Sequence, residues 1–134
     1  MKVSIDNKIT KTNHANLSFD NDEILHVLID YRHGLSIDDA KEIVAVAIKM
    51  SKNKKFLCLM KSLNYKLPSR EVRILPAGDE VKQYITAMAF IAGNSVANIA
   101  AKFFLQISKP PFPFKIFSND KEAIVWLKSF QTKI

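Results

Sequence analysis

Gly93-Asn94-Ser95 is the segment in which residue type and spacing most resemble a reactive site. A serine between small residues at a strand-to-helix turn is typical of the G-x-S-x-G nucleophile elbow of hydrolases. Here Ala97 replaces the final glycine. In the hydrolase fold the catalytic histidine follows the serine, whereas all three histidines of this chain precede it: His14, His26 and His33. The pattern favours Asn94 or Ser95 as a helix cap, and it leaves open an anion bound by the free N–H groups of Gly93, Asn94 and Ser95.

The remaining titratable residues do not form a metal site in the sequence. The histidines lack a paired spacing, and Cys58 is a single cysteine in an apolar run. Asp20, Asp22 and Glu23 form an acidic cluster that lacks the glycine and spacing of a calcium loop, so we expect a hairpin turn there. Since no set of acid, base and nucleophile is present, we expect no catalytic residues, no metal, no cofactor and no enzyme.

Composition indicates one globular domain. The 134 residues are 48% hydrophobic and 25% charged, which is enough to build a single core. We expect a cytoplasmic protein without a membrane span, because no apolar run approaches the ~20 residues of a transmembrane helix and the first residues do not resemble a signal peptide.

The net charge of +7 invites a nucleic-acid hypothesis, which the residue types weaken. Lysine accounts for 17 of the 20 basic residues, whereas base and phosphate recognition favours the planar fork of arginine. The lysines are scattered, apart from a cluster at residues 52–55 that is typical of an exposed helix-to-strand turn. Nucleic acid is therefore not the partner we expect.

Hydrophobic periodicity predicts the elements of the first half of the chain. Residues 16–19 and 24–30 are expected to form a β-hairpin, and residues 37–51 an amphipathic helix that begins after Ser36. The apolar run 56–60 is expected to be a central strand covered on both faces. We take residues 15–134 as the domain and leave open whether residues 1–14 form an edge strand or a loose arm.

The second half continues the alternation of strands and helices. Short helices are expected near residues 69–75 and 79–83, a strand over 85–91, a helix over 94–106, a strand over 114–117 and a last helix after Asn119. This order predicts a single-domain α/β fold: a mixed, largely parallel sheet opened by a β-hairpin, with about four helices.

The order of elements resembles the STAS domain, the fold of sporulation anti-anti-sigma factors and of cytoplasmic domains of sulfate transporters. The C-terminal third is similar to an uncharacterised bacterial branch of STAS-like proteins. The similarity lies in four motifs: Phe103-Phe104-Leu105; Lys109-Pro110 with Pro113; Lys115-Ile116-Phe117; and Glu122-Ala123 with Trp126-Leu127. The opening of the predicted helix, Leu35 to Ile43, is also similar to that family. The whole resemblance covers roughly residues 15–130 and implies a non-catalytic module for protein interaction or regulation.

The resemblance also implies a candidate switch. The best-known STAS members are phosphorylated on a serine at the start of the helix after the central strand, and the nearest residue here is Ser69, followed by Ser62. The acidic residue common at the end of that strand is replaced by Lys61. Ser69 as a plain helix cap remains the simpler interpretation.

The predicted helix 94–106 is more apolar than one sheet face requires. Either neighbouring helices cover the excess or a partner does, and the candidate interface residues are Ala97, Ala101, Phe103 and Phe104. A homodimer is one expected assembly, and the partner protein is otherwise unknown. The alternative function is a small apolar-ligand or anion-binding carrier, with its pocket near residues 93–95.

Overall fold

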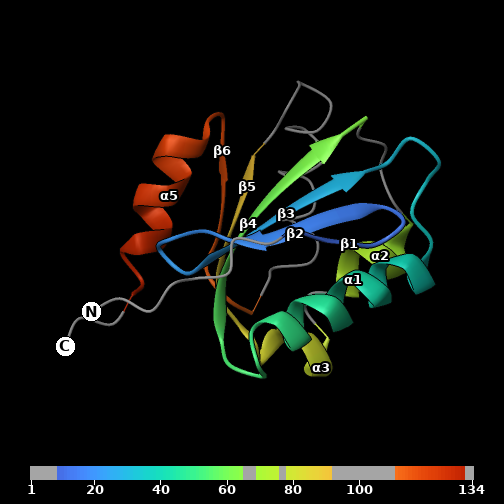
Figure 1. Ribbon diagram of the computed structural model, residues 1–134, viewed down its shortest axis with the longest axis horizontal. Helices are drawn as coiled ribbons and strands as arrows, with labels where there is room; N and C mark the ends of the chain where they lie inside the picture. Colours follow the sequence, from blue (N-terminus) through green and yellow to red (C-terminus); the bar gives the residue numbers. More distant parts are fainter. Residues whose placement is uncertain (1–8, 65–68, 76–77, 92–110, 132–134) are drawn as a thin grey trace.

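One six-stranded sheet forms the centre of the molecule in the computed structural model, which describes residues 9–64, 69–75, 78–91 and 111–131 (Figure 1). The strands lie in chain order: β1 (Thr10–Lys11), β2 (Ala15–Phe19), β3 (Ile24–Asp30), β4 (Phe56–Leu63), β5 (Ile85–Ile91) and β6 (Phe114–Phe117). The first two pairs are antiparallel and the other three are parallel. The predicted α/β class, with a mixed sheet opened by a hairpin, is confirmed.

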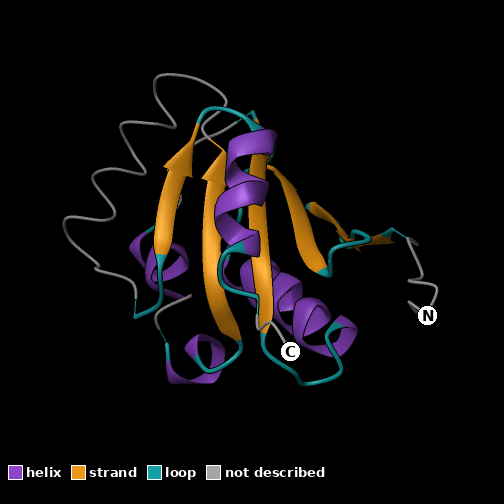
Figure 2. Ribbon diagram, turned by 90° about the vertical axis from the view of Figure 1, so that its left-hand side faces the viewer, coloured by secondary structure: helices purple, strands orange, loops and turns teal. Residues whose placement is uncertain are grey.

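Helices cover both faces of this sheet. The described residues include four: α1 (Ile37–Met50), α2 (Arg70–Ile74), α3 (Asp79–Lys82) and α5 (Asp120–Lys128). Connections between parallel strands are almost always right-handed, so when each strand is added on the same side of the previous one, the connecting helices lie on one face of the sheet. Accordingly, α1, α2 and α3 share a face. No such rule constrains α5, which follows the last strand and packs on the opposite face (Figure 2). The predicted helix over 94–106 lies outside the described residues.

The β2–β3 hairpin is built by its acidic turn, as predicted. The Asp20 carboxylate accepts hydrogen bonds from the N–H groups of Asp22 at 2.8 Å and Ile24 at 3.0 Å. Glu23 has a φ of 64°, and the local hydrogen bonds of the aspartate hold the chain in this turn. On the other side of the hairpin, the two residues of β1 pair with β2.

Local capping residues set the bounds of the longer helices. Ser36 accepts a hydrogen bond from the Asp39 N–H, and the Asp39 carboxylate accepts one from the Ser36 N–H, both at 3.1 Å. Asn119 caps α5 by accepting from the Glu122 N–H at 2.9 Å. Gly34, just before α1, has a φ of 80°, a left-handed conformation that glycine adopts without strain.

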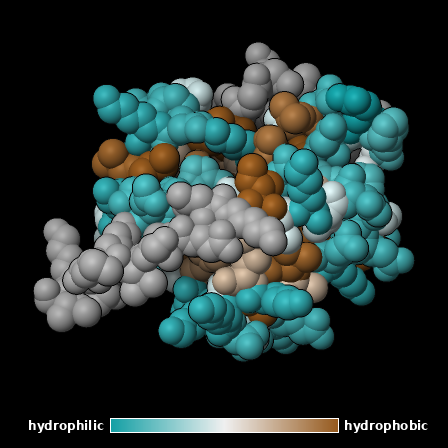
Figure 3. Space-filling model, in the orientation of Figure 1, coloured by the Kyte–Doolittle hydropathy of each residue, from teal (hydrophilic) through white to brown (hydrophobic). Residues whose placement is uncertain are grey.

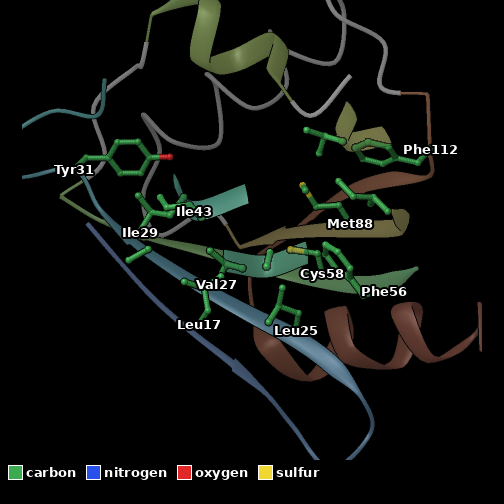
Figure 4. Close-up of a cluster of buried hydrophobic side chains, with 14 residues drawn as sticks. Leu17, Leu25, Val27, Ile29, Tyr31, Ile43, Phe56, Cys58, Met88 and Phe112 are labelled. Carbon is green, nitrogen blue, oxygen red and sulfur yellow. The ribbon is translucent and has the colours of Figure 1, made fainter. Parts of the chain in front are cut away.

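The core has two layers because side chains of β4 alternate between the faces. Phe56 and Cys58 point into a cluster with α1 and α3, while Leu57 and Leu59 point toward α5. Figure 4 shows the first of these clusters, with Cys58 close to Met88 and Phe56. The prediction of a central strand covered on both faces is confirmed.

The end of β4 corrects the sequence prediction, which stopped the strand at Met60. The strand continues through Leu63, because Lys61, Ser62 and Leu63 pair in register with the last three residues of β3. Two of these three residues are polar, so the apolar run that predicts the strand ends before them. The backbone of β3 supplies the partners that extend it.

Candidate functional site

The carboxyl ends of the parallel strands β3 and β4 form the edge where ligands commonly bind in open α/β sheets. Both polar residues at the end of β4 lie there, Lys61 opposite Leu28 and Ser62 opposite Ile29. Since successive side chains point to opposite faces, Lys61 lies on the α5 face and Ser62 on the face of α1 and α2. The candidate site therefore has two separate sides.

The Ser62 hydroxyl is buried and has no hydrogen-bond partner within the described part of the chain. A buried hydroxyl without a partner costs about 1–3 kcal/mol of desolvation, so such groups are rare in proteins. The Ser62 side-chain oxygen is thus a buried polar atom at this edge to which the described residues supply no hydrogen bond.

Ser69 lies in a different environment. It is exposed and caps α2, where its hydroxyl accepts a hydrogen bond from the Val72 N–H at 3.4 Å. The cap predicted from the sequence is therefore present. Of the two candidate serines, Ser69 has the side chain that solvent reaches, and it precedes the helix that follows the central strand β4.

A carboxylate joins the ends of β3 and β4. Asp30 accepts hydrogen bonds from the Arg32 N–H at 2.9 Å and from the Asn64 side-chain amide at 3.1 Å. These bonds, first that from Asn64, lower the pKa of Asp30 below its ordinary value. Asn64 has a φ of 52°, a left-handed conformation that asparagine tolerates well. Sequence reasoning missed this contact, because nothing local indicates a pair 34 residues apart.

Lys61 pairs with Asp120 in the first turn of α5. The partner of Lys61 thus lies 59 residues later in the chain, and the ion pair links β4 to the helix on the opposite face from Ser62. An acidic residue in a first helical turn was visible in the sequence, but its distant partner was not.

Cys58 is not placed for reaction. Burial raises the pKa of its thiol to about 12, so the thiol stays protonated at neutral pH. Within the described residues, no three metal-ligating side chains gather at one point. No helix there is both long and apolar enough to span a membrane.

The other candidate residues named from the sequence lie outside the described residues. They are the turn residues Gly93, Asn94 and Ser95 and the interface residues Ala97, Ala101, Phe103 and Phe104. Those expectations therefore stay predictions.

The sheet topology and its helices define a single-domain α/β protein, with a mixed sheet that begins with a β-hairpin. A family model described as a domain of unknown function, DUF7793, matches residues 17–131, and the chain belongs to this family. A solved structure described as a protein with unknown function from Arthrobacter sp. FB24 is similar over 88% of this chain and 95% of that chain, with 21% sequence identity and a TM-score of 0.32. No curated protein matches the chain.

Proposed function

We propose that this chain is a STAS-like, non-catalytic module for protein interaction or regulation that acts in the cytoplasm. The observation that carries the proposal is the sheet itself, in which an antiparallel hairpin continues into parallel strands taken in chain order, with helices between β3 and β4 and between β4 and β5. This is the order of elements on which the resemblance to STAS domains rests. The C-terminal motifs support it further, since Phe117, Trp126 and Leu127 meet where α5 packs on the sheet.

Within this proposal, Ser69 is the regulated serine. Its exposed hydroxyl is accessible to a modifying enzyme, and its place before the helix that follows β4 is the one that the resemblance indicates. Ser62 is disfavoured because its hydroxyl is buried. A phosphate at Ser69 would add up to two negative charges beside Arg70 and so change the surface that a partner meets.

Affinity capture from the source cells tests both parts of the proposal. We expect the wild-type chain to retain a partner protein at saturable, near-stoichiometric amounts, and the bait to carry phosphate on Ser69. Ser69→Asp and Ser69→Ala should differ about fivefold or more in the amount of partner retained, because aspartate resembles the phosphorylated serine and alanine cannot be phosphorylated. Ser36→Asp is the matched control, because Ser36 is also an exposed helix cap.

The outcomes separate the two parts. If no protein is retained in saturable amounts, the interaction role is contradicted. If a partner is retained equally by all variants and Ser69 carries no phosphate, only the switch is contradicted. A second copy of this chain is one candidate partner, and sedimentation velocity over a range of concentrations would detect that homodimer.

A carrier of a small ligand is the second candidate, and the Ser62 hydroxyl favours it. A ligand with a polar group could supply the missing hydrogen bond at the carboxyl edge of β4. Mass spectrometry of the protein purified under non-denaturing conditions would reveal a bound small molecule. Loss of that molecule in Ser62→Ala would favour the carrier over the interaction module.

A further inference from the structure

The net positive charge of this protein comes from one continuous segment. Residues 43–70 contain seven basic side chains and no acidic one. The other 13 basic residues of the chain are matched by 13 acidic residues outside this segment, so the segment accounts for the whole net charge of +7. Charge asymmetry of this kind within one domain indicates an interaction surface.

The fold gathers four of these side chains at the amino end of β4. Lys49 lies in the last turn of α1, and Lys52, Lys54 and Lys55 lie in the turn that leads into the strand. All four are exposed, and we call them the amino-end lysine cluster. The lower edge of the molecule in Figure 3, where Figure 1 places this turn and α3, is hydrophilic.

Backbone hydrogen bonds hold the cluster in a defined conformation. The N–H of Asn53 donates to the Ile48 carbonyl and that of Lys52 to the Lys49 carbonyl, both at 3.1 Å, the pattern of a Schellman motif. The Phe56 N–H donates to the Tyr84 carbonyl at 2.8 Å, which ties the turn to the start of β5. The lysines therefore extend from a fixed backbone.

The position of Lys52 is unusual for a purely structural turn. Its φ is 57°, and the residue after a helix cap in this motif is usually glycine, because a side chain is strained there. The negative end of the helix dipole accounts for a basic residue at Lys49 or Lys52, but it falls off within a turn and does not account for Lys54 and Lys55.

The cluster also lacks internal neutralisation. Among the described residues, Lys61, Lys82 and Lys128 form ion pairs with aspartates, whereas none of the four cluster lysines is in such a pair. The adjoining helix α3 carries Asp79 and Glu80, and Asp79 is engaged by Lys82 at 3.0 Å. Four exposed ammonium groups thus face solvent with their charge uncompensated by a nearby ion pair.

We propose that the amino-end lysine cluster docks an acidic segment of a partner protein. This inference rests on the proposed function and names the chemistry of the partner. Lysine in place of arginine argues against a phosphate backbone, which arginine binds bidentately, and residues 49–55 contain no aromatic side chain on which a base could stack. The carboxylates of a short acidic segment complement the charge of four ammonium groups that are close in the chain, and they need neither arginine nor an aromatic side chain.

The test measures binding of a fluorescently labelled deca-glutamate peptide to the whole chain by anisotropy at low ionic strength. The cluster variant carries Lys52→Gln, Lys54→Gln and Lys55→Gln. The control variant carries Lys11→Gln, Lys41→Gln and Lys121→Gln, three exposed lysines elsewhere, so both lose the same charge. We expect the cluster variant to bind about tenfold more weakly and the control variant to change less than about twofold, with affinity falling as salt is added.

Equal losses in the two variants would overturn the proposal, because binding would then follow net charge alone. Absence of peptide binding to the wild type would overturn it as well. An oligothymidylate of ten residues, or vesicles of phosphatidylserine and phosphatidylcholine, binding more tightly than the peptide through the same lysines would replace it with a nucleic-acid or membrane site. A partner captured by the wild-type chain despite any of these results would leave the proposed function standing.

Discussion

At the carboxyl edge of the sheet, Ser62 is the residue whose substitution tells most through the free energy of unfolding. Because its hydroxyl is buried without a partner among the described residues, Ser62→Ala should raise the free energy of unfolding by about 1 kcal/mol in urea denaturation. Ser69→Ala should lower it by about 0.5–1 kcal/mol through loss of the α2 cap. Destabilisation by Ser62→Ala would mean that the hydroxyl has a bonding partner, as the carrier function requires.

Asp39 should make α1 sensitive to acid. Hydrogen bonds from the N–H and then the hydroxyl of Ser36 lower the pKa of Asp39, and His14 at 3.2 Å adds to this when protonated. A lowered folded pKa contributes stability above the unfolded value of about 3.9, and this stability is lost as the pH falls through the folded pKa. Asp39→Asn keeps an acceptor for the Ser36 N–H but does not titrate.

We therefore expect wild type to be more stable than Asp39→Asn at neutral pH, and the difference to disappear as the pH falls below about 4. Urea denaturation at several pH values measures this difference. A difference that stays constant with pH would show that the carboxylate charge does not contribute.

At the scale of the elements, the end of α1 offers a test of backbone strain. Lys52 occupies a left-handed position that favours glycine, so Lys52→Gly should stabilise the fold by up to about 1 kcal/mol. Lys52→Ala removes the same charge but keeps the strain, and its thermal midpoint should stay close to that of wild type. Equal midpoints for the two variants would contradict the strain argument.

Docking of α5 depends on a side chain that is fully buried. Leu127 is 0% exposed in the layer between α5 and the sheet, and Leu127→Ala should cost about 2–5 kcal/mol of unfolding free energy. Val125 lies on the same helix but is 66% exposed, and Val125→Ala should change stability by less than about 0.5 kcal/mol. Similar losses for both variants, measured by chemical denaturation, would contradict the assigned helix face.

Sequence reasoning predicted these elements where their signals are local. The cap at Ser36, the acidic hairpin turn and the run of branched apolar residues in β3 each involve residues close in the chain, and each was recovered. The end of β4 was not, since its polar residues are held in the strand by pairing with β3. Local patterns predict well that a strand or helix is present, but they do not predict how far pairing with a neighbouring strand extends a strand.

At the scale of the whole molecule, the missing information is pairwise and distant. The ion pair of Lys61 with Asp120 and the hydrogen bond of Asn64 to Asp30 join residues that no periodicity relates. The face that α5 covers is likewise set by packing, because no crossover rule applies after the last strand. The sequence did predict the class and the two-sided sheet, on which the proposed interaction function rests.

The measurement that tests this function most directly is native mass spectrometry of the chain isolated from its source cells by affinity. We predict a complex of the chain with a protein, either another species or a second copy, at a fixed ratio that persists on dilution toward the dissociation constant. Recovery of the bare chain alone, or of the chain with only a small molecule of a few hundred daltons, would contradict the account.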